Sequence, residues 1–210
     1  MPLRESEVHL WSLELASDIS TERFWALLSG DERERANRFR MERDWVRFVV
    51  FRGVLRILLS RYLGGDPASV AFTYAAKGKP SIASGGIHFN VSHSHDMAVY
   101  AFGIEELGVD VEWAKRAVEV EAIASRFFSP DECAWILGSG SRVEAFFDCW
   151  TRKEAYIKAE GGGLSIPLDT FSVRGPLPWE LYAWKPAPDY FAAAAVKGQK
   201  SFVHRRFELE

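Results

Sequence analysis

The stretch WTRKEAYIKAEGGGL, residues 150–164, combines a helical pattern with a charged residue on the face that should be buried. When residues 146–158 are placed on a helix at about 100° per residue, one arc becomes apolar. This arc holds four large side chains, Phe146, Phe147, Trp150 and Ile157. The opposite side, which we expect to be exposed, holds Asp148, Arg152 and Ala155. Glu154 falls inside the apolar arc, and since an unpaired buried carboxylate is costly, it needs a metal ion, a cation or a ligand as its partner.

Around this helix the chain predicts a mixture of helices and strands, and therefore an α+β fold. Two capping-box sequences, SGDE at residues 29–32 and SPDE at residues 129–132, each predict the start of a helix. A long amphipathic helix is expected over residues 45–62, and the helix that carries Glu154 should stop at the glycines 161–163. Strands are expected at 8–15, 70–74, 87–91, 97–102, 107–113, 171–173, 179–184 and 190–196.

Composition describes an ordinary soluble globular protein. The chain has 210 residues, of which 48% are hydrophobic and 26% are charged. A net charge of -3 gives no general reason to expect nucleic acid or an anionic membrane as partner. The two cysteines form no framework and indicate free thiols in a reducing cytoplasm. The most hydrophobic stretch, residues 48–63, is interrupted by arginines and cannot span a bilayer.

The length admits one large domain or two halves of about 100 residues each. A boundary near residues 103–108 favours two helix-and-sheet halves, 1–103 and 104–210. Charge is unevenly spread between them, since residues 33–61 contain nine arginines and only three acids. This segment suggests a small anionic ligand or an acidic partner protein, and the alternative is a solvated helix face with internal ion pairs.

Two carboxylates share one face of the predicted strand in GVDVEW, residues 108–113. Because side chains alternate along a strand, Asp110 and Glu112 point one way and the valines beside them point the other way. Neighbouring carboxylates repel and are usually kept ionised by a cation between them. Oxygen ligands without nearby Cys or His suit Mg²⁺ better than zinc. We therefore expect Asp110, Glu112 and Glu154 to hold Mg²⁺; the alternative is a solvent-facing pair on an edge strand.

Mg²⁺ bound by few carboxylates completes its shell with water and phosphate oxygens, so cations for a phosphate should lie nearby. The candidates are Lys77, Lys79, Ser92, His93 and Lys158. His93 and His95 could begin a zinc site, but no further ligands are spaced to complete it. Ser92 and His93 make a poor nucleophilic pair, because adjacent residues rarely let the imidazole reach the hydroxyl.

Four motifs occur in a fixed order along the chain. They are GKP at 78–80, FNVSHS at 89–94, GVDVE at 108–112 and the opening stretch at 150–164. The segment RFFSPDE at 126–132 lies between the last two. Together they resemble the motifs of the 4′-phosphopantetheinyl transferases of the surfactin-synthetase-activating type, whose signatures read G-(I/V)-D-(I/V)-E and W-(S/T)-x-K-E-(A/S)-x-x-K.

This resemblance covers most of the chain, residues 35–173. It implies two similar α+β halves related by a pseudo-twofold axis, with coenzyme A bound in the cleft between them. It also implies transfer of the phosphopantetheine arm of coenzyme A to a serine of a carrier protein, with release of 3′,5′-ADP. By motif position, Asp110, Glu112 and Glu154 would hold Mg²⁺ on the pyrophosphate.

The other motif positions imply further roles in the same reaction. Lys158 would contact the phosphates and assist the leaving group. The adenosine 3′-phosphate and neighbouring atoms would be bound by Lys79, Ser92, His93 and Arg35. Glu154, directly or through a water molecule, would accept the proton of the attacking serine.

The sequence departs from the family pattern at three positions. His95 follows the second serine of FNVSHS, where glycine is common, which bears on the conformation of that loop. Phe48 stands where a small polar residue can help to bind the ligand. Glu32 stands where some relatives carry a basic phosphate contact.

Two other classes of function remain as alternatives: a module that binds coenzyme A or a carrier protein without catalysis, and an unrelated Mg²⁺-dependent phosphohydrolase. For the transferase we expect an apo acyl or peptidyl carrier protein as partner. Because carrier proteins tend to be acidic around their serine, docking is expected on the Arg-rich segment and around Phe127 and Phe128. We expect a cytoplasmic monomer that binds neither nucleic acid nor a membrane.

Overall fold

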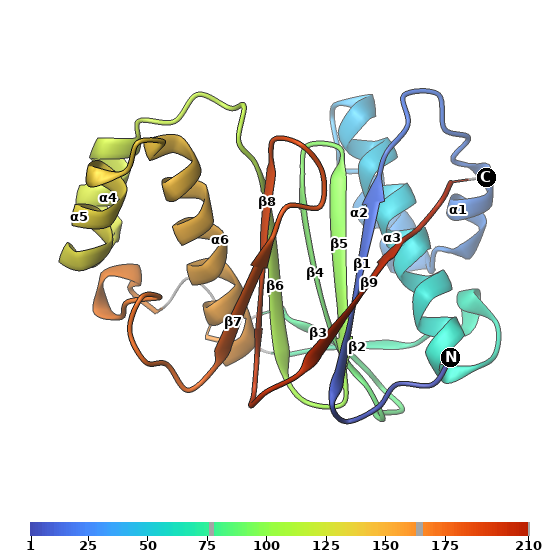
Figure 1. The fold of residues 1–210 in the computed structure, drawn as a ribbon. Coiled ribbons are helices and arrows are strands. Elements are labelled where there is room, and N and C mark those ends of the chain that lie inside the picture. The colour runs from blue at the N-terminus through green and yellow to red at the C-terminus, as the bar shows by residue number, and fades with distance from the viewer. Residues whose placement is uncertain (76–77, 163–165, 210) are drawn as a thin grey trace.

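The computed structural model of the chain describes residues 1–75, 78–162 and 166–209. Its main body has four layers (Figure 1): helices, a four-stranded sheet, a three-stranded sheet and a second group of helices. The predicted α+β class is confirmed. No helix in the described residues has the length and apolar character needed to cross a membrane.

The first sheet has the strand order β4–β5–β1–β9. Its strands are β1 (Glu7–Glu14), β4 (His88–Ser94), β5 (Met97–Gly103) and β9 (Ser201–Arg206). β4 and β5 form an antiparallel hairpin in which Ser94 lies opposite Met97. His95, in the two-residue connection, has a φ of 53°, the positive value that such short hairpin turns favour. β9 runs parallel to β1, so a strand from the end of the chain completes the sheet of the N-terminal half.

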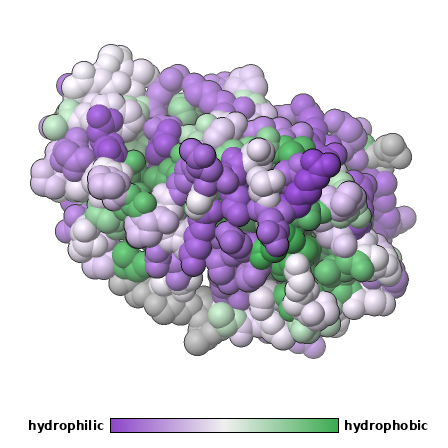
Figure 2. All heavy atoms as spheres, turned by 60° about the horizontal axis from the view of Figure 1, so that its bottom comes forward, coloured by the Kyte–Doolittle hydropathy of each residue, from purple (hydrophilic) through white to green (hydrophobic). Residues whose placement is uncertain are grey.

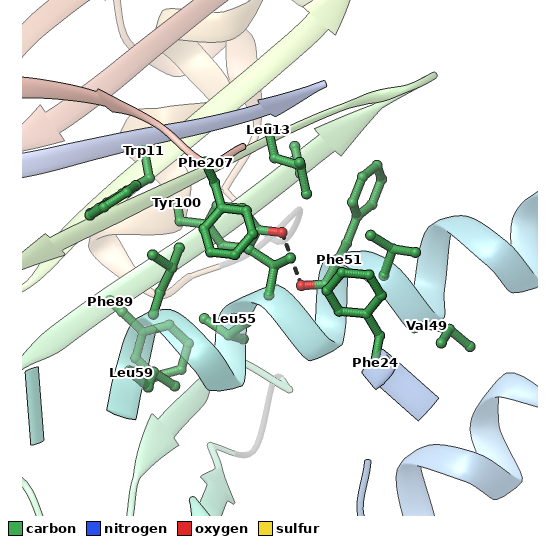
Figure 3. Close-up of a cluster of buried hydrophobic side chains, with 14 of the residues drawn as sticks. Trp11, Leu13, Phe24, Val49, Phe51, Leu55, Leu59, Phe89, Tyr100 and Phe207 are labelled. Atoms are coloured by element: carbon green, nitrogen blue, oxygen red, sulfur yellow. Dashed lines mark hydrogen bonds between the residues drawn. The ribbon is translucent and has the colours of Figure 1, made fainter. Parts of the chain in front are cut away.

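Three helices cover the outer face of this sheet: α1 (Glu22–Leu27), α2 (Gly30–Ala36) and α3 (Glu42–Leu63). α3 buries one side against β1 and β5, as its amphipathic sequence predicted. Figure 3 shows this core, where the hydroxyl of Tyr100 donates to the carbonyl oxygen of Phe51 at 2.9 Å. This bond satisfies the one polar group of a fully buried tyrosine and fixes the position of α3 on the sheet.

The second sheet has the order β6–β8–β7, with β6 (Leu107–Trp113), β8 (Tyr190–Val196) and β7 (Glu180–Trp184). Its outer face carries α4 (Val120–Phe127), α5 (Pro130–Gly138) and α6 (Arg142–Glu160), of which α6 lies on β6 and β8. α6 ends at Gly161, which has the left-handed conformation typical of a helix C-terminus. The predicted stop is therefore confirmed at Gly161, whereas Gly163 lies outside the described residues.

The inner faces of the two sheets pack on each other through small and branched side chains. β1, β5, β6 and β8 contribute residues such as Leu10, Val99, Val109 and Ala194 to this core. The sheets also approach along one edge, where β4 of the first lies beside β6 of the second (Figure 1). The contact between the two halves is therefore a shared apolar core together with a pair of adjacent edge strands.

Short elements complete the fold. A two-stranded hairpin of β2 (Phe72–Tyr74) and β3 (Pro80–Ile82) follows the 3₁₀ turn η1 (Pro67–Ser69), and a second turn, η3 (Leu168–Thr170), follows α6. Both predicted capping boxes are confirmed, at the starts of α2 and α5. The sequence pattern did not identify α1, α4, β3 or β9.

The predicted strand at 171–173 is wrong. The backbone groups of this segment form hydrogen bonds with buried side chains, whereas those of a strand would bond to a neighbouring strand. The carbonyl oxygen of Phe171 accepts from Lys153 at 2.6 Å, and the amide of Val173 donates to Glu132 at 2.7 Å. With these groups occupied, the segment follows an irregular path across α5 and α6.

The proposed boundary after residue 103 coincides with the end of β5 and the change from the first sheet to the second. Residues 201–206, on the far side of that boundary, nevertheless pair with β1. Each half contributes a sheet with a long helix on its outer face. The pseudo-twofold axis between the halves stays a prediction.

Candidate active site

Gly108 allows helix α6 to lie directly against strand β6. A Cβ at this position would stand 2.1 Å from the carbonyl oxygen of Ala155, so a larger residue would force the two elements apart. For the same reason Ala155 is fully buried, and the prediction that it faces solvent is wrong. The close approach brings Glu154 and Lys158, on the adjoining turns of α6, to the carboxylates of β6.

Asp110 is the buried centre of this contact. Its Oδ1 accepts from the hydroxyl of Ser92 at 2.8 Å and from the ammonium of Lys158 at 2.6 Å. Lys158 also donates to Ser92 at 2.9 Å and to the carbonyl oxygen of Val109 at 3.2 Å. The other oxygen, Oδ2, is buried and finds no hydrogen-bond partner among the described residues. A buried carboxylate oxygen in this state is costly unless a further cation or donor satisfies it.

Glu112 and Glu154 add two more carboxylates to the same region. Both side chains are partly buried, and so are Asp148 and Arg152, on the side of α6 that was expected to face solvent. Burial, followed by the nearby charge of Asp110, raises the pKa of Glu154 to about 7, with Lys158 acting in the opposite direction. The same two causes, burial and then Asp110, raise the pKa of Glu112. The three carboxylates therefore share a region of excess negative charge.

This region fits a divalent cation by its chemistry. All three acids offer oxygen, and one buried oxygen lacks a partner among the described residues. A positive ion would offset both the burial and the repulsion that raise the two pKa values. Oxygen donors suit Mg²⁺. Within the residues that the structure describes, however, no three His, Cys, Asp or Glu side chains are grouped closely enough to form a ready metal site.

A groove formed by two adjoining pockets leads to Lys158. The pockets share Gly78, Pro80 and Val91. Between them they contain four of the predicted phosphate-binding residues: Arg35 and His93 in one, Lys79 and Lys158 in the other. Ser92 lines neither pocket: it is buried, and its hydroxyl bonds to Asp110 and Lys158. Lys77 lies outside the described residues.

The charged residues of the groove differ in how free they are. Lys79 is paired with Glu106 at 2.6 Å, and although burial acts to raise the pKa of Glu106, this bond lowers it. His93 keeps an exposed edge and rests against the ring of Phe51, with the ring centroids 5.7 Å apart. Enclosure by the pocket walls, and then the charges of Lys158, Arg47 and Arg35, lower its pKa. On the face shown in Figure 2, hydrophilic side chains cross the middle of the molecule between more hydrophobic areas.

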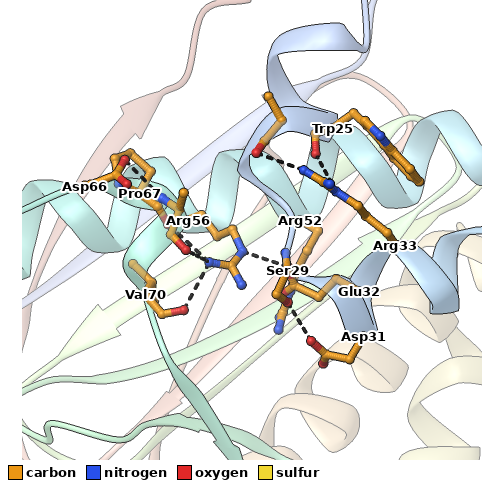
Figure 4. Close-up of polar contacts among 12 residues, drawn as sticks. Trp25, Ser29, Asp31, Glu32, Arg33, Arg52, Arg56, Asp66, Pro67 and Val70 are labelled. Carbon is orange, nitrogen blue, oxygen red and sulfur yellow. Dashed lines mark hydrogen bonds and ion pairs between the residues drawn. The ribbon is translucent and has the colours of Figure 1, made fainter.

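Glu32 is a structural carboxylate whose partner Arg52 lines the groove, and Figure 4 shows its polar contacts. It opens α2 through the capping box and pairs with two arginines of α3, Arg52 at 2.5 Å and Arg56 at 2.7 Å. Arg56 also donates to the carbonyl oxygens of Pro67, Ala68 and Val70. Burial acts to raise the pKa of Glu32, but the bonds to Arg56 and Arg52 lower it overall. These two arginines form ion pairs, as the alternative for the Arg-rich segment expected, but they are not on a solvated face, because Arg56 is fully buried.

Sequence reasoning missed the buried pair of Lys153 and Glu132. Both side chains are fully buried, with the ammonium 2.8 Å from the carboxylate. Lys153 also donates to the carbonyl oxygens of Leu168 and Phe171, so the pair joins α5, α6 and the segment after η3. One signal was present in the sequence. Lys153 stands next to Glu154 on a helix with large apolar residues, so it was a second charged side chain that could have been asked for a buried partner.

Of the two phenylalanines expected on the carrier-docking surface, only one is exposed. Phe127 is exposed. Phe128 is buried and stacks on Phe146, with ring centroids 5.5 Å apart. It belongs to the core of the C-terminal half, so it is not available to a partner.

Two family models match the chain. The model of the 4′-phosphopantetheinyl transferase superfamily matches residues 106–182, and a 4′-phosphopantetheinyl transferase N-terminal model matches residues 16–104. The boundary between the two matches falls between β5 and β6, where the first sheet gives way to the second.

Named relatives agree with the family models. The chain is 35% identical to 4′-phosphopantetheinyl transferase HetI of a Nostoc species, over 97% of this chain and 94% of that protein. It is 37% identical to 4′-phosphopantetheinyl transferase Sfp of Bacillus subtilis, over 75% of this chain and 71% of that protein. Among solved structures, the holo-[acyl-carrier-protein] synthase of Thermotoga maritima is 21% identical, with a TM-score of 0.36. The matched region is 45% of this chain and 64% of the synthase chain.

Two family models thus cover most of the sequence, and a relative more than 30% identical spans nearly all of it. The chain belongs to the 4′-phosphopantetheinyl transferase superfamily, and it is a transferase.

Proposed function

We propose that this transferase moves the 4′-phosphopantetheine arm of coenzyme A onto a serine hydroxyl of an apo carrier protein, with Mg²⁺ as cofactor and 3′,5′-ADP as the released product. Membership of the superfamily supports the reaction. The observation that carries the site assignment is the meeting of Asp110 with Lys158 and Ser92, beside an unpartnered carboxylate oxygen.

The carboxylates of Asp110, Glu112 and Glu154 would hold the cation. When bound, Mg²⁺ neutralises charge that develops on the pyrophosphate during transfer. Mutual repulsion and the buried Oδ2 of Asp110 support this assignment, because both are relieved by a positive ion. In the described part of the chain, two cations already contact these acids: Lys158, 2.6 Å from Asp110, and the more exposed Arg116, 3.3 Å from Glu112.

Lys158 would bind the pyrophosphate and assist departure of 3′,5′-ADP. Its ammonium lies between the buried acids and the groove, with its side chain 28% exposed. A phosphate oxygen that enters from the groove would therefore meet the ammonium before it meets any carboxylate. A positive donor at this point stabilises the charge of the leaving group.

Glu154 would accept the proton of the carrier serine, directly or through a water molecule. A general base must lie within reach of the proton that it takes, and Glu154 stands on α6 one turn before Lys158, beside the carboxylate of Asp110. Its carboxylate accepts no hydrogen bond from any described residue, so it is available to a substrate hydroxyl.

Arg35, Lys79 and His93 would bind the 3′-phosphate and adenosine of coenzyme A along the groove. Ser92 would contribute by holding Lys158 and Asp110 in place. The acyl or peptidyl carrier protein would dock on the Arg-rich segment and Phe127. Composition leads us to expect a cytoplasmic protein without nucleic-acid or membrane partners, and the family type leads us to expect a monomer.

The test is to incubate the protein with coenzyme A, Mg²⁺ and an apo carrier protein and to weigh the carrier by mass spectrometry. A mass gain of one phosphopantetheine arm, abolished when EDTA replaces Mg²⁺, is the expected result. Consumption of coenzyme A without a change in the carrier would favour a phosphohydrolase. Binding of coenzyme A without consumption would favour a non-catalytic module.

A further inference from the structure

Alternate residues of strand β4 bond to strand β6 of the other sheet. The Oδ1 of Asn90 accepts from the amide of Val109 at 2.9 Å. Ser92 donates to Asp110 at 2.8 Å. Ser94 donates to Oε2 of Glu112 at 2.8 Å and accepts from the amide of Trp113 at 3.1 Å. These bonds follow the period of two residues on β4, whose side chains at 90, 92 and 94 share one face.

This arrangement replaces a backbone ladder. β4 and β6 are edge strands of different sheets, and the backbone pairing partners of β4 and β6 are β5 and β8 respectively. The outward amides of β6 at Val109 and Trp113 would lack a partner at this buried junction, and the side chains of Asn90 and Ser94 supply one. The register between the two halves is therefore fixed by side chains at this edge.

Ser94 differs from Asn90 and Ser92 because both of its hydrogen bonds act on Glu112 or on the residue next to it. A hydroxyl can donate and accept at once, so Ser94 holds the carboxylate of Glu112 and the next backbone amide together. The other oxygen of Glu112 faces Arg116 at 3.3 Å, whose side chain is 44% exposed and therefore a weak anchor. Without Ser94, Glu112 would be free to turn away from Asp110.

We propose that Ser94 is a positioning residue that holds Glu112 in the orientation needed for cation binding. This inference rests on the proposed function, since it takes Glu112 as a ligand of the cation. Ser94 contacts neither the cation nor coenzyme A in this proposal and acts through Glu112.

The test is direct cation binding, measured by electron paramagnetic resonance of Mn²⁺ with the full chain in the presence of coenzyme A. Removal of a hydrogen-bonding partner behind a metal ligand typically weakens metal affinity by about 10- to 100-fold, and we expect Ser94→Ala to fall in that range. Ser94→Thr keeps the hydroxyl and should bind Mn²⁺ as the wild type does. Ser201→Ala, which removes an exposed serine at the start of β9, is the matched control and should change nothing.

Kinetics give a second readout. Ser94→Ala should raise the Mg²⁺ concentration needed for half-maximal rate, and it should also lower the melting temperature modestly, because the amide of Trp113 loses its partner. Ser94→Thr should restore the Mg²⁺ requirement. If the wild type binds Mn²⁺ and Ser94→Ala binds it equally well, the inference is wrong and the proposed metal site stands. If the wild type itself binds no Mn²⁺, the metal assignment and this inference both fail.

Discussion

The ammonium of Lys158 lies 2.6 Å from Oδ1 of Asp110, and this contact joins the last turns of α6 to the middle of β6. Ser92 of β4 bonds to both. Residues from both halves of the chain therefore meet at one carboxylate, which is where we place the chemistry.

Glu154→Gln should lower turnover at saturating Mg²⁺ and coenzyme A by at least about 100-fold, the low end of what general base catalysis contributes. The amide keeps the shape of the side chain but loses the charge that would hold the cation and accept the proton. Folding should survive, because a neutral amide costs less to bury than an unpaired carboxylate. Glu144→Gln, at an exposed position on the same helix, is the control. Near-normal turnover together with an unchanged melting curve would remove Glu154 from the mechanism.

Gly108→Ala should lower the free energy of unfolding by about 1–3 kcal/mol, the usual range for overpacking. The reason is that the added methyl would meet backbone atoms of α6. Urea unfolding measures the change. Gly138→Ala, where a Cβ would meet nothing within 4 Å, should be close to neutral. A Gly108→Ala protein as stable as the Gly138→Ala protein would show that α6 can move away from β6 without loss.

Lys153→Met should destabilise the protein by about 3–5 kcal/mol, since it leaves Glu132 buried without its cation. The double variant Lys153→Met with Glu132→Leu should recover part of this loss, because no charge is then left in the core. Lys185→Met breaks an exposed pair with Glu144 and should cost less than about 1 kcal/mol. Equal effects of the two lysine substitutions would contradict the buried role of Lys153.

Glu32 should contribute to stability in a pH-dependent way. Its pKa in the folded protein lies below the ordinary value of 4.5, so the unfolded chain binds the proton more readily. The contribution is therefore complete above the ordinary value and is lost as the pH falls through the lower folded pKa. Glu32→Gln should be less stable at neutral pH and should lose less stability on acidification. Glu34→Gln, exposed on the same helix, should follow the wild-type curve.

Carrier docking should weaken with salt if charge steering by the Arg-rich segment draws in an acidic partner. We expect the KM for the carrier protein to rise with ionic strength, and to rise also in Phe127→Ala, with kcat little changed. Val143→Ala, which truncates another exposed apolar side chain, is the control. A carrier KM that ignores salt but responds to Phe127→Ala would assign the docking to apolar contacts.

Much of the fold followed from local signals. The two capping boxes, the long helix ending near Gly64, and the strands with clear alternation or apolar runs all form where the pattern predicted them. Short elements such as α1 and β3 carry too few residues for a periodic pattern. The segment around Phe171 has apolar residues typical of a strand, but Lys153 and Glu132 occupy its backbone groups.

The candidate site followed partly from the sequence. The alternation of GVDVE predicted the shared face of Asp110 and Glu112, and the helical period placed Glu154 inward. Neither pattern could reveal that Ser92 and Ser94 bond to those acids, because β4 and β6 belong to different sheets. The burial of Ala155 was also hidden, since it depends on the missing Cβ of Gly108 across the interface.

The sequence by itself determined the family, the residue types of the site and the helices and strands that carry them, because motifs and periodicities are local properties of the chain. Tertiary structure alone decided which side chains meet: Lys158 with Asp110, Lys153 with Glu132, and β9 with β1. These contacts join residues far apart in the sequence. A local pattern cannot tell which of many possible partners a side chain meets, because that depends on how closely the elements pack and on which groups they bury together.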